Sequence, residues 1–322
     1  MADDKFRRNY DATRGYLDRI EEFGPEPVLN SIYNVFPVEF DSGDMQRRIR
    51  EVFAPHRKPL TMFDINLGRL YQRSKFRKAA LCSMPKSGST FILSSLARLK
   101  GEKFSGVFLH TPYLNPDFVG ALACEHEIDE LSLLMLETRQ HNWVSHMHTK
   151  WTPYTELIFR SHSIRPIITY RNIFDCIVSM DDMLMKRDIA GFSMIRLPRR
   201  YFEMSAEERL TLLCHFAGPW YVDFVVSWSR VQIPVLRLNY EADIRGFSDE
   251  TADRLRTFLG LEEVDEAEFR GAFQLVDDDT RNRARFNQGI SGRGAAIPAA
   301  AREHILTLTS AYDGEVDFSA VL

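Results

Sequence analysis

Residues 79–101 have the sequence AALCSMPKSGSTFILSSLARLKG, and this stretch decides the fold. Residues 79–84 form a short apolar run, typical of a buried strand, and a Pro-Lys-Ser-Gly turn follows it. The residues after the turn have helical spacing, and we expect Gly101 to end that helix. Four apolar side chains share one broad face of the helix: Phe91, Leu93, Leu96 and Leu99. The stretch therefore predicts a strand, a loop and a helix in that order.

The same alternation recurs along the rest of the chain. Further strands are expected at residues 143–148, 165–171 and 233–240. Helices are expected within residues 152–163, 172–186, 205–230 and 250–260. Strands that alternate with helices predict a parallel sheet with right-handed crossovers.

We therefore expect an α/β fold: a P-loop-like doubly wound parallel sheet flanked by helices, forming a single domain over residues 76–322. Residues 1–75 are expected to be a helical or irregular lead-in that packs on this domain. Ligands of such sheets bind at the carboxyl ends of the strands, which directs attention to the residues just after 84, 148, 171 and 240.

The composition narrows the function classes. The chain has 322 residues, 44% of them hydrophobic, and a formal net charge of −4, which gives no reason to expect a nucleic-acid partner. We find neither an apolar run long enough for a membrane span nor a secretory signal. The four cysteines are widely spaced and form no CxxC pair, so we expect no disulfide framework and no zinc site. A cytoplasmic protein fits these features best.

The turn at residues 85–90, Pro-Lys-Ser-Gly-Ser-Thr, carries the first chemical signal. Backbone N–H groups of such a turn, at the start of a helix, can cradle a phosphate. Lys86 adds a positive charge, and Ser89 and Thr90 add hydroxyl donors. The alternative is an ordinary Ser/Thr-rich helix cap. The pattern differs from the Walker sequence because the lysine precedes the glycine.

This order of residues resembles the loop with which cytosolic-type sulfotransferases bind the 5′-phosphosulfate end of 3′-phosphoadenosine 5′-phosphosulfate (PAPS). The family's second signature is similar to residues 170–179, YRNIFDCIVS. There Ser179 follows Arg171 by eight residues, which matches the family's spacing. The resemblance implies that Arg171 and Ser179 hold the 3′-phosphate of PAPS. A strand-end arginine offers a planar fork of donors that suits a phosphate.

Two more segments resemble the family. Residues 238–260 are similar to its strand that ends in Tyr-Glu, which implies that Tyr240 lies near the adenine. Phe91 stands where the family usually has Trp after the loop and is a candidate to stack on the base. The closing loop of the family is matched in part by FNQGISGRG, residues 286–294.

In that closing loop the family's Arg-Lys pair is replaced by Asn287 and Gln288, whereas Gly289 is kept. Nearby arginines are the candidates to supply the missing charge: Arg281, Arg283, Arg285 and Arg293. The implied nucleotide site comprises Lys86, Ser87, Gly88, Ser89, Thr90, Phe91, Arg171, Ser179, Tyr240, Arg285, Asn287, Gln288, Gly289 and Arg293. The resemblance covers roughly residues 79–294.

Sulfuryl transfer needs positioning, charge stabilisation and an acceptor for a proton. The resemblance implies that Lys86 stabilises the leaving phosphate and that His148, at the end of the strand before Arg171, is the general base. His146 lies on the same strand face and is the second candidate for this role. Three glutamates compete with these histidines: Glu125, Glu127 and Glu130. We find no metal-ligand spacing, so no metal is expected.

The sequence is thus interpreted as a PAPS-dependent sulfotransferase acting on a hydroxyl or amine of a glycan, lipid-linked or small-molecule acceptor. The sequence RNIFD, at residues 171–175, resembles that of bacterial members of the family more than that of animal phenol or steroid sulfotransferases. Six aromatic residues and one methionine are the candidates to line the acceptor pocket: Phe104, Phe108, Tyr113, Phe118, Trp143, Phe192 and Met183. A P-loop nucleotide kinase and a nucleotide-binding pseudo-enzyme of the same fold stay open as alternatives. The oligomeric state also stays open, with a homodimer as one candidate.

Overall fold

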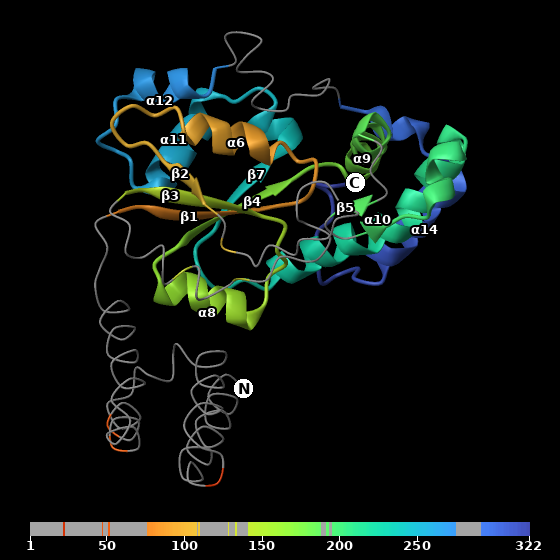
Figure 1. The fold of residues 1–322 in the computed structure, drawn as a ribbon, viewed down its shortest axis with the longest axis horizontal. Helices are drawn as coiled ribbons and strands as arrows, with labels where there is room; N and C mark the ends of the chain where they lie inside the picture. Colours follow the sequence, from red (N-terminus) through yellow and green to blue (C-terminus); the bar gives the residue numbers. More distant parts are fainter. Residues whose placement is uncertain are drawn as a thin grey trace.

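The fold is built on a parallel sheet that is buried on both faces (Figure 1). The computed structural model describes residues 76–107, 109, 141–187, 191–192, 195–274 and 291–322, with the single positions 22, 47, 51, 128 and 133. The central strands are β2 (Ser105–Val107), β3 (Trp143–Met147), β1 (Lys78–Ser83), β4 (Arg165–Tyr170) and β7 (Leu236–Asn239), in that spatial order. All four neighbouring pairs are parallel.

Helices cover both faces of the sheet. The helices on one face are α6 (Ser89–Leu96), α11 (Asp249–Leu259) and α12 (Glu266–Ala272). The helices on the other side are α8 (Pro153–Ser161), α9 (Ile173–Arg187), α10 (Ala206–Ser229) and α14 (Ala299–Ser310). Figure 1 shows α6, α11 and α12 above the sheet and α8 below it. This doubly wound arrangement confirms the predicted fold class.

The strand β1 shows why the sheet is buried on both faces. All six of its residues are buried. Ala80 and Cys82 belong to the core cluster under α8, α9 and α10, whereas Ala79 and Leu81 belong to the cluster under α6 and α11. Successive side chains of a strand point to opposite faces, so a strand covered twice needs a continuous apolar run.

Short elements complete the described chain. A two-stranded antiparallel ribbon joins β5 (Gly191–Phe192) to β6 (Ile195–Arg196). Two 3₁₀ turns, η2 (Arg199–Glu203) and η4 (Arg293–Ala296), and one π turn, η3 (Tyr240–Ile244), connect larger elements. None of the described helices is long and apolar enough to cross a membrane.

Several predicted boundaries are wrong. The first helix ends at Leu96 and not at Gly101, because the Leu96 carbonyl accepts a hydrogen bond from the Phe104 amide at 3.3 Å, where the chain has turned toward β2. The edge strand β2 was not predicted. The last strand begins at Leu236, three residues later than expected.

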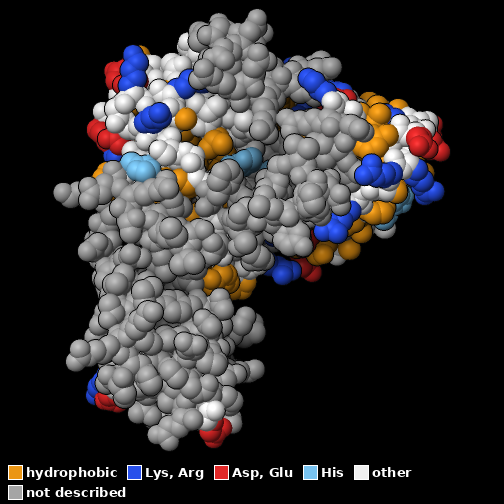
Figure 2. Space-filling view, in the orientation of Figure 1, with side chains coloured by type: hydrophobic (Ala, Val, Ile, Leu, Met, Phe, Trp, Pro, Cys, Tyr) orange, Lys and Arg blue, Asp and Glu red, His pale blue; other side chains and the backbone are white. Residues whose placement is uncertain are grey.

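The described surface carries charges of both signs. In the view of Figure 2, Lys and Arg side chains alternate with Asp and Glu side chains over the described surface, and hydrophobic atoms are visible on the side where α10 and α14 lie. Phe216 of α10 is 49% exposed and Leu306 of α14 is 38% exposed. Of the predicted pocket aromatics, Phe104 and Trp143 are fully buried in the two core clusters, so their rings are used in packing.

Candidate functional site

The loop after β1 has a backbone shaped by two left-handed residues. Lys86 has a φ of 70° and Gly88 a φ of 84°, and Gly88 is the N-cap of α6 without a capping side chain. The left-handed conformation costs roughly 1–2 kcal/mol for a residue with a side chain, so Lys86 is held there by its surroundings. The loop therefore presents a helix N-terminus at the carboxyl end of β1, which is an arrangement that suits an anion.

Ser87 fastens this loop to the sheet. It is fully buried, and its hydroxyl donates to the Met84 carbonyl at 2.6 Å. The same hydroxyl is hydrogen-bonded to that of Thr169 in β4, also at 2.6 Å. Ser87 thus stabilises the conformation of the loop, whereas Ser89 and Thr90 lie in the first turn of α6.

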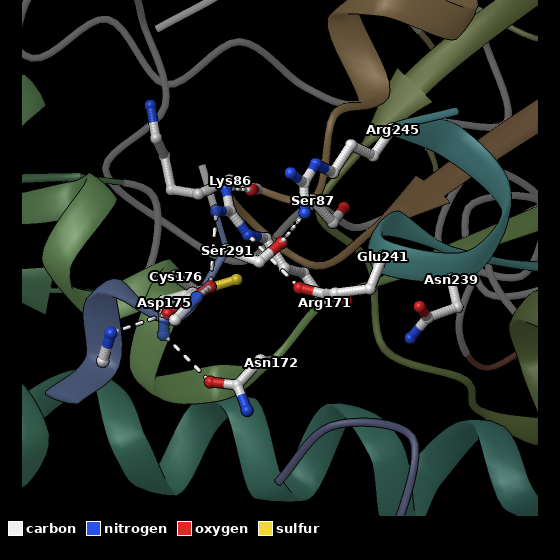
Figure 3. A network of polar contacts seen from close by, with 12 residues as sticks. Lys86, Ser87, Arg171, Asn172, Asp175, Cys176, Asn239, Glu241, Arg245 and Ser291 are labelled. Atoms are coloured by element: carbon white, nitrogen blue, oxygen red, sulfur yellow. Dashed lines mark hydrogen bonds and ion pairs between the residues drawn. The ribbon is translucent and has the colours of Figure 1, made fainter. Parts of the chain in front are cut away.

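Arg171 follows β4 directly and reaches the loop. Its Nη1 donates to the Lys86 carbonyl at 3.3 Å, and the residue is only 6% exposed. Two carboxylates lie near the guanidinium: Asp175 Oδ2 is 3.6 Å from Nη2, and Glu241 Oε1 is 3.7 Å from Nε. Figure 3 shows this network with the ends of β4 and the start of α9. The two motifs that sequence analysis assigned to phosphates therefore meet.

Tyr240 joins the same group from the end of β7. The Arg171 guanidinium lies 4.1 Å from the centre of the Tyr240 ring, a cation–π contact. On the loop side, a Cβ added to Gly88 would lie 3.0 Å from Tyr240 Cδ2, so only glycine fits against this ring. Tyr240 hence packs between the loop and Arg171, and its predicted contact with an adenine stays a prediction.

Glu241, next to Tyr240, was not singled out from the sequence. Burial raises the pKa of its carboxyl above the ordinary value of 4.5, and backbone hydrogen bonds and the charge of Arg171 offset part of that rise. The Tyr-Glu pair that follows β7 was quoted in the sequence, but only the fold brings this carboxylate to Arg171.

Asp175 connects α9 to the end of the predicted closing loop. Its carboxylate accepts hydrogen bonds from the Gly292 amide at 2.9 Å and from the Gly294 amide at 2.6 Å. Gly294 approaches so closely that a Cβ there would lie 2.4 Å from Phe174 Cβ. A carboxylate that is 3% exposed and bound by two amides is a strong anchor for that segment.

Further contacts surround this anchor. Arg293 donates to Asp182 Oδ2 at 2.6 Å, and Arg302 donates to the Gly294 carbonyl at 2.9 Å. A cavity of about 410 Å³ lies alongside. It is lined by residues at or next to α9, η3, η4 and α14: Asn172, Asp175, Glu241, Ser291, Gly292, Gly294, Ala295 and Arg302.

The two histidines lie together at the end of β3. Their ring centres are 4.9 Å apart and nearly perpendicular, and His148 is 6% exposed whereas His146 is half-buried. His148 Nδ1 lies 2.8 Å from the Ser83 carbonyl, which can only accept, so Nδ1 carries the proton. Neutral His148 consequently has its lone pair on Nε2, the nitrogen a general base would use.

The other predicted residues fall into two groups. Ser179 is buried in α9. Phe91 packs edge-on against the rings of Phe247 and Phe273, two residues that the sequence interpretation did not include. Further predicted positions lie outside the described residues: Arg281, Arg283, Arg285, Asn287, Gln288, Gly289, Glu125, Glu127, Glu130, Phe108, Tyr113 and Phe118. Over the described part of the chain, no three His, Cys, Asp or Glu side chains gather as a metal site would require.

The comparisons with known proteins place the fold. No protein-family model and no curated protein matches the chain. Among solved structures, the chain is similar to mouse sulfotransferase SULT7A1 complexed with PAP, with a TM-score of 0.52 and 17% sequence identity. The match covers 77% of this chain and 88% of that chain. It supports the sulfotransferase type of α/β fold and gives no support to a closer likeness to bacterial members.

Proposed function

We propose that this protein is a PAPS-dependent sulfotransferase. The observation that carries the proposal is the hydrogen bond of 3.3 Å from Arg171 to the Lys86 carbonyl, because it joins two candidate phosphate-binding motifs at one edge of the sheet. The similarity of the fold to a sulfotransferase complexed with PAP supports the proposal independently of these residues.

The residues present fit the proposed nucleotide. The loop with Lys86 would hold its 5′ end, and Arg171, with Ser179 on α9, would hold its 3′-phosphate. When bound, PAPS supplies a sulfuryl group on a phosphate leaving group. Lys86 stabilises the negative charge that develops on that phosphate, and the guanidinium of Arg171 offers further donors to the 3′-phosphate.

His148 is the proposed general base. Its Nδ1–H is fixed on the Ser83 carbonyl at 2.8 Å, so Nε2 is the nitrogen that takes the proton from the acceptor hydroxyl or amine. The acceptor class that we propose is a glycan, lipid-linked or small-molecule hydroxyl. The closing-loop residues from Arg285 to Gly289, and Arg293 beyond them, complete the proposed site.

Nucleotide selectivity tests the proposal. PAP (3′,5′-diphosphoadenosine) should raise the melting temperature strongly, because a ligand that binds only the folded state stabilises it by about 2.7 kcal/mol at a hundred times its Kd. AMP and ATP lack the 3′-phosphate and should raise the melting temperature much less. Equal shifts from all three nucleotides would remove Arg171 and Ser179 from the proposed 3′-phosphate site.

Transfer of label from radioactive PAPS to a panel of phenols, sugars and amines then tests the chemistry. Lys86→Ala should lower turnover by roughly 10²–10³, the effect of losing one donor to the transition state. Lys86→Gly is the matched variant, because it removes the same charge but relieves the left-handed backbone at φ 70°. Binding of PAP without any transfer would indicate the pseudo-enzyme instead.

A further inference from the structure

The two histidines are joined by a buried hydroxyl that the proposed function does not use. Ser83 is the last residue of β1 and is fully buried. Its Oγ lies 2.9 Å from His146 Nε2, 3.3 Å from His148 Nδ1 and 3.2 Å from the Met147 carbonyl. One hydroxyl therefore lies within hydrogen-bond range of a nitrogen on each ring.

The register of the sheet explains this meeting. Leu81 of β1 pairs with His146 of β3, and Cys82 pairs with Met147, so Ser83 lies level with His148. Side chains at positions 146 and 148 point to the same face because a strand alternates with a period of two. The arrangement thus depends on strand pairing between positions more than 60 residues apart.

From this geometry we infer that His146, through Ser83, takes up the proton that His148 removes from the acceptor. This inference rests on the proposed function. The acceptor O–H or N–H bond breaks, and its proton binds His148 Nε2. The Nδ1–H of His148 lies within range of both the Ser83 carbonyl, at 2.8 Å, and Ser83 Oγ, at 3.3 Å, and its proton passes to Oγ while the Ser83 hydroxyl proton passes to His146 Nε2. One proton has then moved from the acceptor to His146, and no oxidant or reductant is needed.

Burial gives the transfer its direction. His148 is 6% exposed, and a buried imidazolium is costly, whereas half-buried His146 is better solvated. After the products leave, the same steps run in reverse and the proton leaves from His148 Nε2 to water. The transfer requires that His146 Nε2 carry no proton and that the Ser83 O–H, which also lies within range of the Met147 carbonyl at 3.2 Å, donate to this nitrogen.

This requirement is tested by nitrogen-15 NMR of the imidazoles in the full-length, ligand-free protein. We expect His146 to have its proton on Nδ1 in the wild type. Ser83→Ala removes the hydroxyl and keeps the carbonyl, so His148 should keep its Nδ1–H form while His146 returns toward its ordinary mixture of forms. Ser145→Ala is the matched control: it also removes a buried hydroxyl, one that accepts from the Leu109 amide at 3.3 Å. It should change neither ring.

Kinetics provide the second readout. Ser83→Ala should lower kcat for labelled PAPS and a simple phenol roughly tenfold, about the effect of one hydrogen bond on a transition state, with unchanged PAP affinity. His146→Gln should lower kcat equally, the double variant should lower it no further, and Ser83→Thr should restore it. Non-additivity of this kind is expected of residues that act as one unit.

The outcomes separate the inference from the proposed function. A wild-type His146 that carries its proton on Nε2, or a Ser83→Ala variant with wild-type kcat, overturns the relay and leaves the sulfotransferase proposal intact. A protein that neither binds PAP nor transfers label overturns the proposed function. In that case the relay has no acceptor proton to move and is overturned as well, whatever the tautomers.

Discussion

Glu241 competes with any bound phosphate for Arg171, and this competition has a pH dependence. Burial raises the pKa of Glu241, so the folded state holds its proton at pH values where the unfolded chain has lost it. The stability from this group is therefore fully present below the ordinary pKa of 4.5 and is lost as the pH rises through the raised value. The Glu241→Gln variant has no carboxyl group to lose its proton, so it should be spared this loss of stability. The amount by which its melting temperature exceeds that of the wild type should therefore be larger at about pH 7 than at about pH 4.

Glu250→Gln is the control for this comparison, because Glu250 is an exposed glutamate in the first turn of α11. It should show no comparable rise between the two pH values. The Glu241→Gln variant should also bind PAP more tightly, since one carboxylate less faces Arg171 at 3.7 Å. A lower melting temperature for Glu241→Gln at both pH values would mean that the ion pair with Arg171 outweighs burial.

At the scale of single residues, the sequence predicts only those site residues that belong to a short recognisable motif. Lys86 and Arg171 were identified because short stretches carry them in a recognisable order, and the structure brings their backbones and side chains together. Ser83 and Glu241 were not predicted as site residues. Their neighbours come from other strands, and the contact of Ser83 with His146 depends on a register that no local pattern encodes.

Between elements, the hydrogen bonds of Asp175 hold η4 on α9. We therefore expect that a substitution of this one side chain lowers the stability of the protein substantially. Asp175→Asn keeps one acceptor oxygen but replaces the other by an NH₂ group, which cannot accept, so one of the two hydrogen bonds from the Gly292 and Gly294 amides is lost. Each lost hydrogen bond to a charged group costs about 1.5–3 kcal/mol of unfolding free energy, measurable by denaturant titration. PAP affinity should fall too, because Gly292 and Gly294 belong to the predicted closing loop.

Asp182→Asn on the same helix is the matched control. The Asp182 side chain is 35% exposed and holds the Arg293 side chain rather than a backbone amide. An ion pair this accessible contributes about 0–1 kcal/mol, so the variant should be nearly as stable as the wild type. Similar losses for both variants would show that Asp175 is an ordinary ion-pair partner and anchors nothing.

The elements themselves were predictable where their periodicity was strong. The strand β1 was found because its middle residues are apolar and both of its faces are buried. The helix at residues 172–186 was found because apolar residues recur at helical spacing on one broad buried face. The three-residue strand β2 was missed because it is too short to show alternation. The end of α6 was missed because a contact with Phe104, and not a local stop signal, terminates it.

In the whole molecule, the candidate site collects residues from four strand ends. Ser83, Met147, Tyr170 and Asn239 end β1, β3, β4 and β7, and all four strands run in the same direction. The parallel sheet and the rule that ligands bind at its carboxyl edge were both predictable from the alternation of elements. The order of strands was not, because it depends on which crossovers return beside β1.

The last residues of the sequence also contact this edge. Val321 accepts from the Ile173 amide at 2.8 Å, and Ala320 accepts from the Asn239 side chain at 2.8 Å. Phe318 anchors the turn in the core, where it is 7% exposed, and its carbonyl accepts from the Val321 and Leu322 amides. The turn therefore supports the residues that directly follow Arg171.

This support predicts that Phe318→Ala affects stability and binding together. Truncation of a buried phenylalanine costs about 3–5 kcal/mol of unfolding free energy, and the loosened turn should weaken PAP binding roughly tenfold by calorimetry. Leu259→Ala is the control: Leu259 is fully buried in the other core cluster, at the end of α11, and its loss should cost a similar 2–5 kcal/mol. It should leave PAP affinity unchanged, because no described contact links it to Arg171. If both variants lose affinity equally, binding follows global stability, and the C-terminal turn has no specific influence on the site.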